Sequence, residues 1–171
     1  MYALLHPFVQ IALLRCKPQD LPASTLLLKL ALSAHVVLGV FMFTSRLALP
    51  QALLAGAVST LVMCVLVASL LFANRRSARI VQTLTAMAGS DVVVGIAALP
   101  VTSWLQAPLD GASASGLTAL LFLLLVAWNL IVAGHVLRHA LSSPLPLGVV
   151  LALVLYMISV NVIHALFPGM A

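Results

Sequence analysis

The chain has 171 residues, of which 64% are hydrophobic and only 6% are charged, and its formal net charge is +5. Soluble domains are about half apolar and about a quarter charged, so this composition excludes an ordinary soluble domain. The cations gather at the ends of apolar runs, which indicates orientation in a membrane and argues against nucleic-acid binding. We predict an all-α integral membrane protein, because helices satisfy their own backbone groups in lipid and the alternating pattern of a membrane barrel is absent.

The first 24 residues predict an amino-terminal interfacial segment. The apolar stretch over residues 3–15 falls short of the roughly 20 residues that a bilayer crossing needs. Its apolar residues recur at helical spacing, and basic residues follow directly (Phe8, Ile11, Leu14; Arg15, Lys17). This pattern is typical of an amphipathic helix that lies in the membrane interface. The first nine residues have neither a basic region nor a cleavage site, so we expect no removable signal peptide.

Residues 25–171 predict a five-helix transmembrane domain. The apolar runs place its spans at about 25–45, 50–73, 78–100, 117–137 and 146–167. Proline marks two of the boundaries. Pro50 suits the first turn of the second span, and Pro100 is expected to close the third.

Five spans put the two termini on opposite sides of the membrane, and the basic residues predict which side each terminus faces. With the amino terminus in the cytoplasm, the cytoplasmic ends carry Arg15, Lys17, Arg75, Arg76, Arg79 and Arg138. Only Arg46 falls clearly on the other side, together with Asp110. We therefore expect a multi-pass protein of the bacterial cytoplasmic (inner) membrane, with a cytoplasmic amino terminus and a periplasmic carboxy terminus.

Polar side chains on three of the spans fall in one layer near the middle of the membrane. Counted from the cytoplasmic end at about 1.5 Å per residue, His35 lies roughly 15 Å deep, Asp91 roughly 18 Å and Asn129 roughly 13 Å. An aspartate at that depth costs about 2.5–3.5 kcal/mol on insertion scales, so it needs a proton or polar partners. His35, Asp91, Asn129 and the adjacent Ser90 therefore form a candidate mid-membrane polar cluster.

Two interpretations of this cluster stay open. In the first, Asp91 and His35 accept and pass a proton or couple to a solute. In the second, Asp91 is neutral or hydrogen-bonded and ties helices together through His35, Asn129 or Ser90. The second is favoured, because proteins that move protons or ions usually carry more than one buried acid, and Asp91 is the only acid at this depth.

The histidines give little support for a cofactor. A haem between helices needs paired histidines at one depth, and neither His135 nor His164 matches the depth of His35. His135 and His139 are spaced i, i+4 on one helix face, so they are weak metal candidates that lack a third ligand. We therefore expect neither a haem nor a metal.

The arginines near the cytoplasmic ends, Arg75, Arg76, Arg79 and Arg138, are candidate contacts for anionic lipid or for an acidic partner loop. Topology alone would also explain them. The sequence has no motif for nucleophilic catalysis, zinc-dependent hydrolysis or phosphate cradling, so we expect no enzyme.

The plan of a short amphipathic start, five spans and an outside carboxy terminus resembles the Yip1-like family of membrane proteins. The stretch Trp128 to Leu141, WNLIVAGHVLRHAL, is similar to the fourth-span region of bacterial Yip1-like proteins. The stretch Lys17 to Ser24, KPQDLPAS, looks like the entry segment of small proteobacterial inner-membrane proteins. The long acidic region and the DLYGP motif of the eukaryotic family are missing. The resemblance therefore implies a membrane adaptor without known catalysis, and it transfers no functional residues.

Together these features predict a non-enzymatic membrane protein that acts as a scaffold, assembly factor or accessory subunit of a larger inner-membrane complex. The expected partners are the lipid bilayer and other membrane subunits. Little mass outside the membrane and small residues on several helix faces favour this function. The alternatives are a proton- or small-solute-conducting component that uses Asp91 and His35, and a haem-anchoring subunit.

Overall fold

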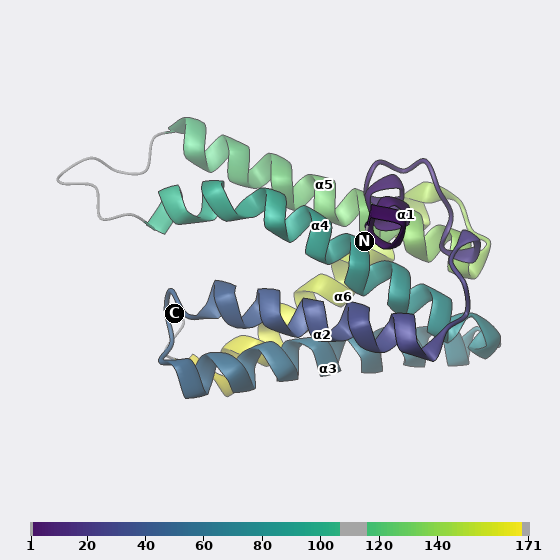
Figure 1. Ribbon diagram of the computed structural model, residues 1–171, viewed down its shortest axis with the longest axis horizontal. Coiled ribbons are helices and arrows are strands. Elements are labelled where there is room, and N and C mark those ends of the chain that lie inside the picture. Colours follow the sequence, from purple (N-terminus) through teal and green to yellow (C-terminus); the bar gives the residue numbers. More distant parts are fainter. Residues whose placement is uncertain (1, 107–115, 169–171) are drawn as a thin grey trace.

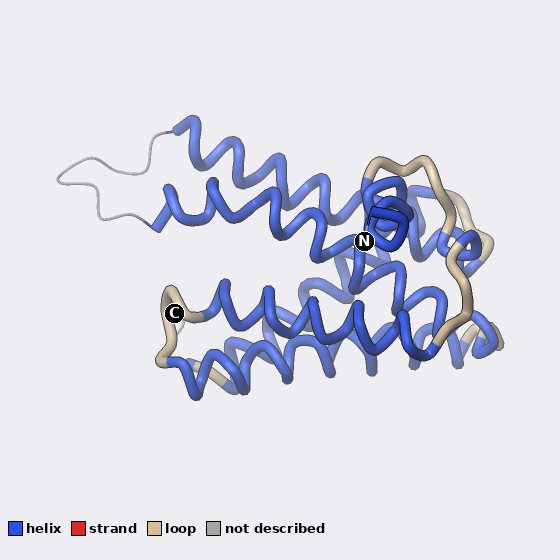
Figure 2. The backbone as a smooth tube through the Cα atoms, viewed as in Figure 1, coloured by secondary structure: helices blue, strands red, loops and turns tan. Residues whose placement is uncertain are grey.

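The structure of the chain is a computed structural model that describes residues 2–106 and 116–168. Within these ranges the chain folds into helices joined by short loops and has no strand (Figure 2). The helices are α1 (Tyr2–Ala12), α2 (Thr25–Phe43), α3 (Leu49–Ala73), α4 (Ile80–Gln106), α5 (Gly116–Leu141) and α6 (Leu145–Leu166). Two short 3-10 turns, η1 (Pro18–Asp20) and η2 (Ser77–Arg79), precede α2 and α4.

Helices α2 to α6 are each long and apolar enough to cross a membrane, which confirms the predicted all-α bundle of five spanning helices. They run along the long axis of the molecule (Figure 1). Each helix packs against the next in the order α2, α4, α5, α6, α3, and α3 returns to α2. The five helices therefore form a closed ring, in which chain order differs from spatial order.

Helix α4 is the most enclosed of the five. Residues 83–90 are all buried, because α1, α2, α3 and α5 contact this part of the helix from different sides. A helix that is buried on every face needs no amphipathic pattern. Residues 83–90 of α4 therefore have no face left open to lipid.

Helix α1 docks on α4 and α5 of its own chain. Figure 1 shows α1 end-on, so it lies across the direction of the spanning helices. The side chains of Phe8 and Ile11 are buried against the bundle. A side chain at Gly89 of α4 would collide with the ring of Phe8, so the glycine makes room for this contact. The backbone carbonyl of Ala12 accepts a hydrogen bond from Trp128 Nε1 of α5 at 2.9 Å.

Two expected helix boundaries differ from the structure. The first helix ends at Ala12 rather than near residue 15, and Leu14 adopts a positive φ of 62° in the turn that follows. Helix α4 was expected to end at Pro100, and this expectation is wrong, because the helix continues to Gln106. Proline removes only one backbone donor, and hydroxyls of Thr102 and Ser103 bond to carbonyls of the same turn.

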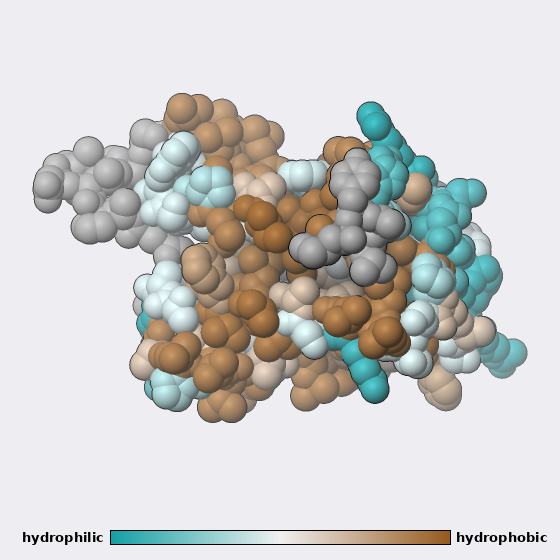
Figure 3. All heavy atoms as spheres, in the orientation of Figure 1, coloured by the Kyte–Doolittle hydropathy of each residue, from teal (hydrophilic) through white to brown (hydrophobic). Residues whose placement is uncertain are grey.

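Hydrophilic side chains gather at one end of the bundle and a broad apolar band crosses its middle (Figure 3). We call this end the basic end; it is formed by residues 13–24, 74–79 and 138–144. Helices α2, α4 and α6 begin at the basic end, whereas α3 and α5 finish there. The first spanning helix therefore starts at the basic end and the last one finishes at the opposite end.

Candidate functional site in the bundle interior

Four polar side chains from four different helices form one connected group, which we call the polar network: His35, Thr60, Asp91 and Asn129. Asn129 Nδ2 donates to Asp91 Oδ1 at 3.2 Å. Asp91 Oδ2 lies 3.7 Å from His35 Nε2. The other ring nitrogen of this histidine, Nδ1, lies 2.9 Å from Thr60 Oγ1. The network thus joins α2, α3, α4 and α5 near the middle of the apolar band.

The hydrogen bonds around Thr60 favour one tautomer of His35. Thr60 donates its hydroxyl hydrogen to the carbonyl oxygen of Gly56 at 2.9 Å, so its oxygen is left to accept from His35 Nδ1–H. Nε2 is then the ring nitrogen that gains or loses a proton, and it faces Asp91.

Close packing of α2 and α3 brings His35 to Thr60. A Cβ added at Gly39 would lie 3.3 Å from the Cα of Gly56. A Cβ added at Gly56 would lie 2.9 Å from the backbone nitrogen of Val40. The two glycines therefore let the backbones cross closely about one turn from the hydrogen bond.

The polar network lines a cavity of about 630 Å³ whose wall is formed by side chains from all five spanning helices. The side chains of His35 and Asp91 keep 16% and 21% of their surface exposed, so both can be reached from this cavity. The wall is mostly apolar and contains methionine and aromatic side chains from several helices (Met42, Met63, Met87; Phe43, Phe122, Tyr156).

The cavity extends from the polar network toward the end opposite the basic end. There its lining includes Ser45, Arg46 and His164, which are all exposed. The helix pairs α2/α3 and α4/α5 diverge toward this end (Figure 1). The arrangement is a chamber with a protonatable pair at its inner part and a mouth at one surface of the bundle.

Three of the four residues predicted for the polar cluster meet in the structure, and Ser90 does not. Its hydroxyl donates to the carbonyls of Ala86 at 2.7 Å and Met87 at 3.1 Å, within its own helix. Serine hydroxyls commonly bond back to the preceding turn in this way. Ser90 is therefore a buried packing residue of α4, although it is next to Asp91 in sequence.

Thr60 is the member of the network that the sequence analysis missed. It lies 13 residues from the end of α3 at Ala73, which is roughly 20 Å at 1.5 Å per residue. The same depth count that selected His35 and Asp91 would have placed Thr60 in their layer. A threonine attracts less attention than an acid because its burial is inexpensive once its hydroxyl bonds to its own helix.

The predicted arginine group divides at the basic end. Arg79 Nη1 donates to the carbonyls of His139 at 3.0 Å and Ala140 at 2.9 Å, so it caps the carboxyl end of α5. Arg76 and Arg79 both reach Ser142 Oγ, at 3.3 Å and 3.1 Å. These two arginines tie the α3–α4 connection to the α5–α6 turn, whereas Arg75 is exposed.

The weak metal candidates His135 and His139 stand side by side, with ring centroids 4.7 Å apart. His135 is buried, and its Nε2 donates to the carbonyl of Cys16 at 3.0 Å. Nε2 of His139 accepts from Arg138 Nε at 3.3 Å. Over residues 2–106 and 116–168, no group of three or more His, Cys, Asp or Glu residues is arranged to hold a metal ion.

The fold and the polar network define the class of this chain: it is a multi-pass helical membrane protein with an interior cavity. Comparison with protein-family models, with curated proteins and with solved structures finds no match. The Yip1-like resemblance is therefore neither supported nor opposed by any relative.

Proposed function

We propose that this protein conducts protons or a small solute, with Asp91 and His35 on the wall of its interior cavity as the proton-carrying pair. The observation that carries the proposal is the 3.7 Å approach of His35 Nε2 to Asp91 Oδ2 on the wall of the cavity. Transfer of the shared proton from the Asp91 carboxyl to His35 Nε2 converts a neutral pair into an ion pair without a change in total charge. A solute in the cavity that prefers one of these two states would couple its binding to the proton.

The network supports transfer in both directions. Asn129 holds one carboxylate oxygen, and Thr60 holds the far side of the imidazole ring. The two reactive atoms, Oδ2 and Nε2, are left facing each other, so a small side-chain motion brings them to hydrogen-bond distance. A purely structural tie between helices does not require either group to be exposed to a cavity.

The proposal includes a location and an orientation. The basic end faces the cytoplasm of a bacterium, and the cavity opens to the periplasm across the inner membrane. The excess of Arg and Lys at the basic end supports this orientation.

The test is proton flux in liposomes that contain the purified full-length chain. Wild type should carry a flux that Asp91→Asn reduces to background, because an amide keeps the shape and cannot carry the proton. Asp20→Asn is the matched control, since Asp20 is an exposed acid outside the cavity. Equal flux in wild type and Asp91→Asn, or none in either, would contradict the proposal.

An accessory-subunit function is the second candidate. Large apolar side chains on the outer faces of the helices are exposed in the isolated chain, such as Leu26, Val37 and Phe41 on α2, and lipid or other subunits can cover them. Membership of the Yip1-like family would fit this function. Mild extraction followed by mass determination should then yield a complex, and a strictly monomeric species would count against it. A haem-anchoring function is less compatible with the site, because both nitrogens of His35 already face protein groups.

A further inference from the structure

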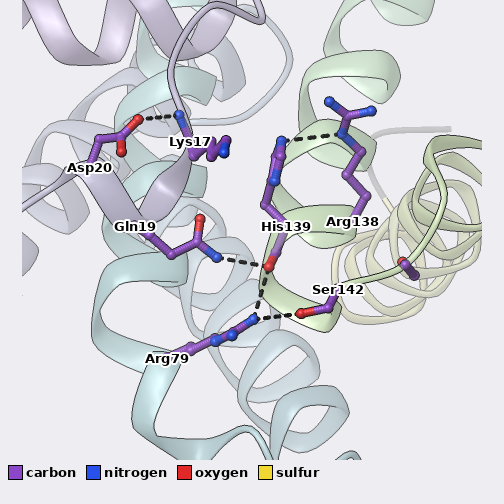
Figure 4. A pocket seen from close by; sticks show the side chains of 8 residues that line it. Lys17, Gln19, Asp20, Arg79, Arg138, His139 and Ser142 are labelled. Atoms are coloured by element: carbon purple, nitrogen blue, oxygen red, sulfur yellow. Dashed lines mark hydrogen bonds between the residues drawn. The ribbon is translucent and has the colours of Figure 1, made fainter.

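We propose that the basic end binds the phosphate group of an anionic phospholipid. The site is an open pocket of about 650 Å³ between η1, η2, the end of α5 and the turn that follows α5. Figure 4 shows Lys17 and Asp20 on one wall, Arg138 and His139 on the facing wall, and Arg79 below them. Three cations thus line the pocket together with one acid.

Two of these charged groups already have partners. Asp20 Oδ2 accepts from the backbone nitrogen of Lys17 at 2.8 Å. Arg79 offsets the partial negative charge of the α5 carboxyl end through its bonds to two backbone carbonyls. The ammonium of Lys17 and the terminal guanidinium nitrogens of Arg138 form no hydrogen bond within the described part of the chain. These two groups are therefore available to an anion.

A buried hydroxyl gives an independent reason to expect a ligand. Ser143 Oγ is shielded from solvent and has no hydrogen-bond partner, and Ser143 belongs to the lining of the same pocket. A buried polar atom without a partner costs free energy. Phosphate oxygens are strong acceptors that a serine hydroxyl, an ammonium and a guanidinium can share.

The position of the pocket identifies the source of the phosphate. It lies where the apolar helices end, which is the level of lipid headgroups if those helices cross a bilayer. Basic pockets at this level of a membrane protein commonly bind anionic headgroups. The pocket is separate from the polar network, so a failure to bind lipid would not contradict the proposed proton conduction, and an absence of proton flux would not contradict lipid binding.

The experiment measures lipid binding by the full-length chain, stripped of lipid in detergent, by native mass spectrometry. The probes are phosphatidylglycerol, phosphatidylcholine and inorganic phosphate. Lys17→Gln and Arg138→Gln should each weaken phosphatidylglycerol binding about fivefold, and the double variant should bind more weakly than either single variant. Lys29→Gln and Arg75→Gln are the matched controls, because each removes an exposed cation outside the pocket.

Phosphatidylglycerol binding that falls in the pocket variants and persists in the controls would support the proposal. If only inorganic phosphate binding falls in the pocket variants and persists in the controls, the pocket is a phosphate site whose ligand is a free anion and not a lipid. Equal affinity in pocket and control variants for every probe would overturn the proposal. Circular dichroism of each variant verifies that the helices are intact.

Discussion

At the scale of single residues, the hydroxyl hydrogen of Thr60 determines how the histidine works. Because this hydrogen goes to Gly56 O, the threonine oxygen must accept from His35, and Nε2 is left toward Asp91. Thr60 does not contact the proton between His35 and Asp91, but it determines that Nε2 is the nitrogen of His35 that can accept this proton. Thr60 is a positioning residue of the proposed pair.

We predict that Thr60→Val lowers the free energy of unfolding by about 1–2 kcal/mol, because His35 Nδ1–H loses its acceptor at a part-buried position. The measurement is denaturant unfolding in micelles. Thr85→Val is the matched control, since the Thr85 hydroxyl bonds to Val81 of its own helix and Thr85 is also buried. Equal losses in the two variants would show that the His35–Thr60 bond adds no stability.

Whether a residue of the candidate site can be predicted from the sequence depends on its type. Asp91, His35 and Asn129 could be selected from sequence because each is expensive at mid-membrane depth. Ser90 was selected by adjacency, and a helix turns successive side chains about 100° apart, so adjacency in sequence is not adjacency in space. The role of Arg79 could not be predicted, because its acceptors are backbone carbonyls 60 residues away in the chain.

At the scale of helices, α1 and α4 depend on each other. Gly89 makes room for the ring of Phe8. Trp128 of α5 donates to the carbonyl of Ala12 at the end of α1, and His135 of α5 donates to the carbonyl of Cys16 just after it. The sequence predicted that α1 exists from its apolar spacing. It could not show that this helix docks on its own bundle, because a helix facing lipid and one facing protein present the same apolar stripe.

We predict that Gly89→Ala displaces α1, because the added methyl group occupies the position of the Phe8 ring and overpacking typically costs about 1–3 kcal/mol. In a Cys64→Ala background, the maleimide labelling rate of Cys16 should rise several-fold. Gly116→Ala is the control, since nothing lies within 4 Å of its added Cβ.

In a Phe8→Ala background, Gly89→Ala should have no further effect on the maleimide labelling rate of Cys16. The smaller side chain leaves space for the new methyl group, so the two substitutions cannot act independently. A labelling rate that rises by the same factor in both backgrounds would contradict the contact between Phe8 and Gly89.

At the scale of the whole molecule, the five spanning helices separate two surfaces of different character. The basic end holds the arginine contacts and the basic pocket, and the opposite end holds the mouth of the cavity. The sequence predicted five spanning helices and the charge difference between the two ends of the bundle. It could not predict the cavity, because α2, α4, α5, α6 and α3 are neighbours in an order unlike their order in the chain.

The most direct test of the account measures from which side of the membrane each end of the helix bundle can be labelled. Both natural cysteines are first replaced, by Cys16→Ser and Cys64→Ser. A single thiol is then introduced in each of two variants: Ser45→Cys near the cavity mouth and Ser77→Cys at the basic end. Both positions are exposed. An impermeant maleimide added to intact cells from which the outer membrane has been removed should label the Ser45→Cys variant. It should label the Ser77→Cys variant only after the remaining membrane is permeabilised. Labelling of both variants from the same side would contradict a bundle that crosses the membrane with its cavity open to the outside.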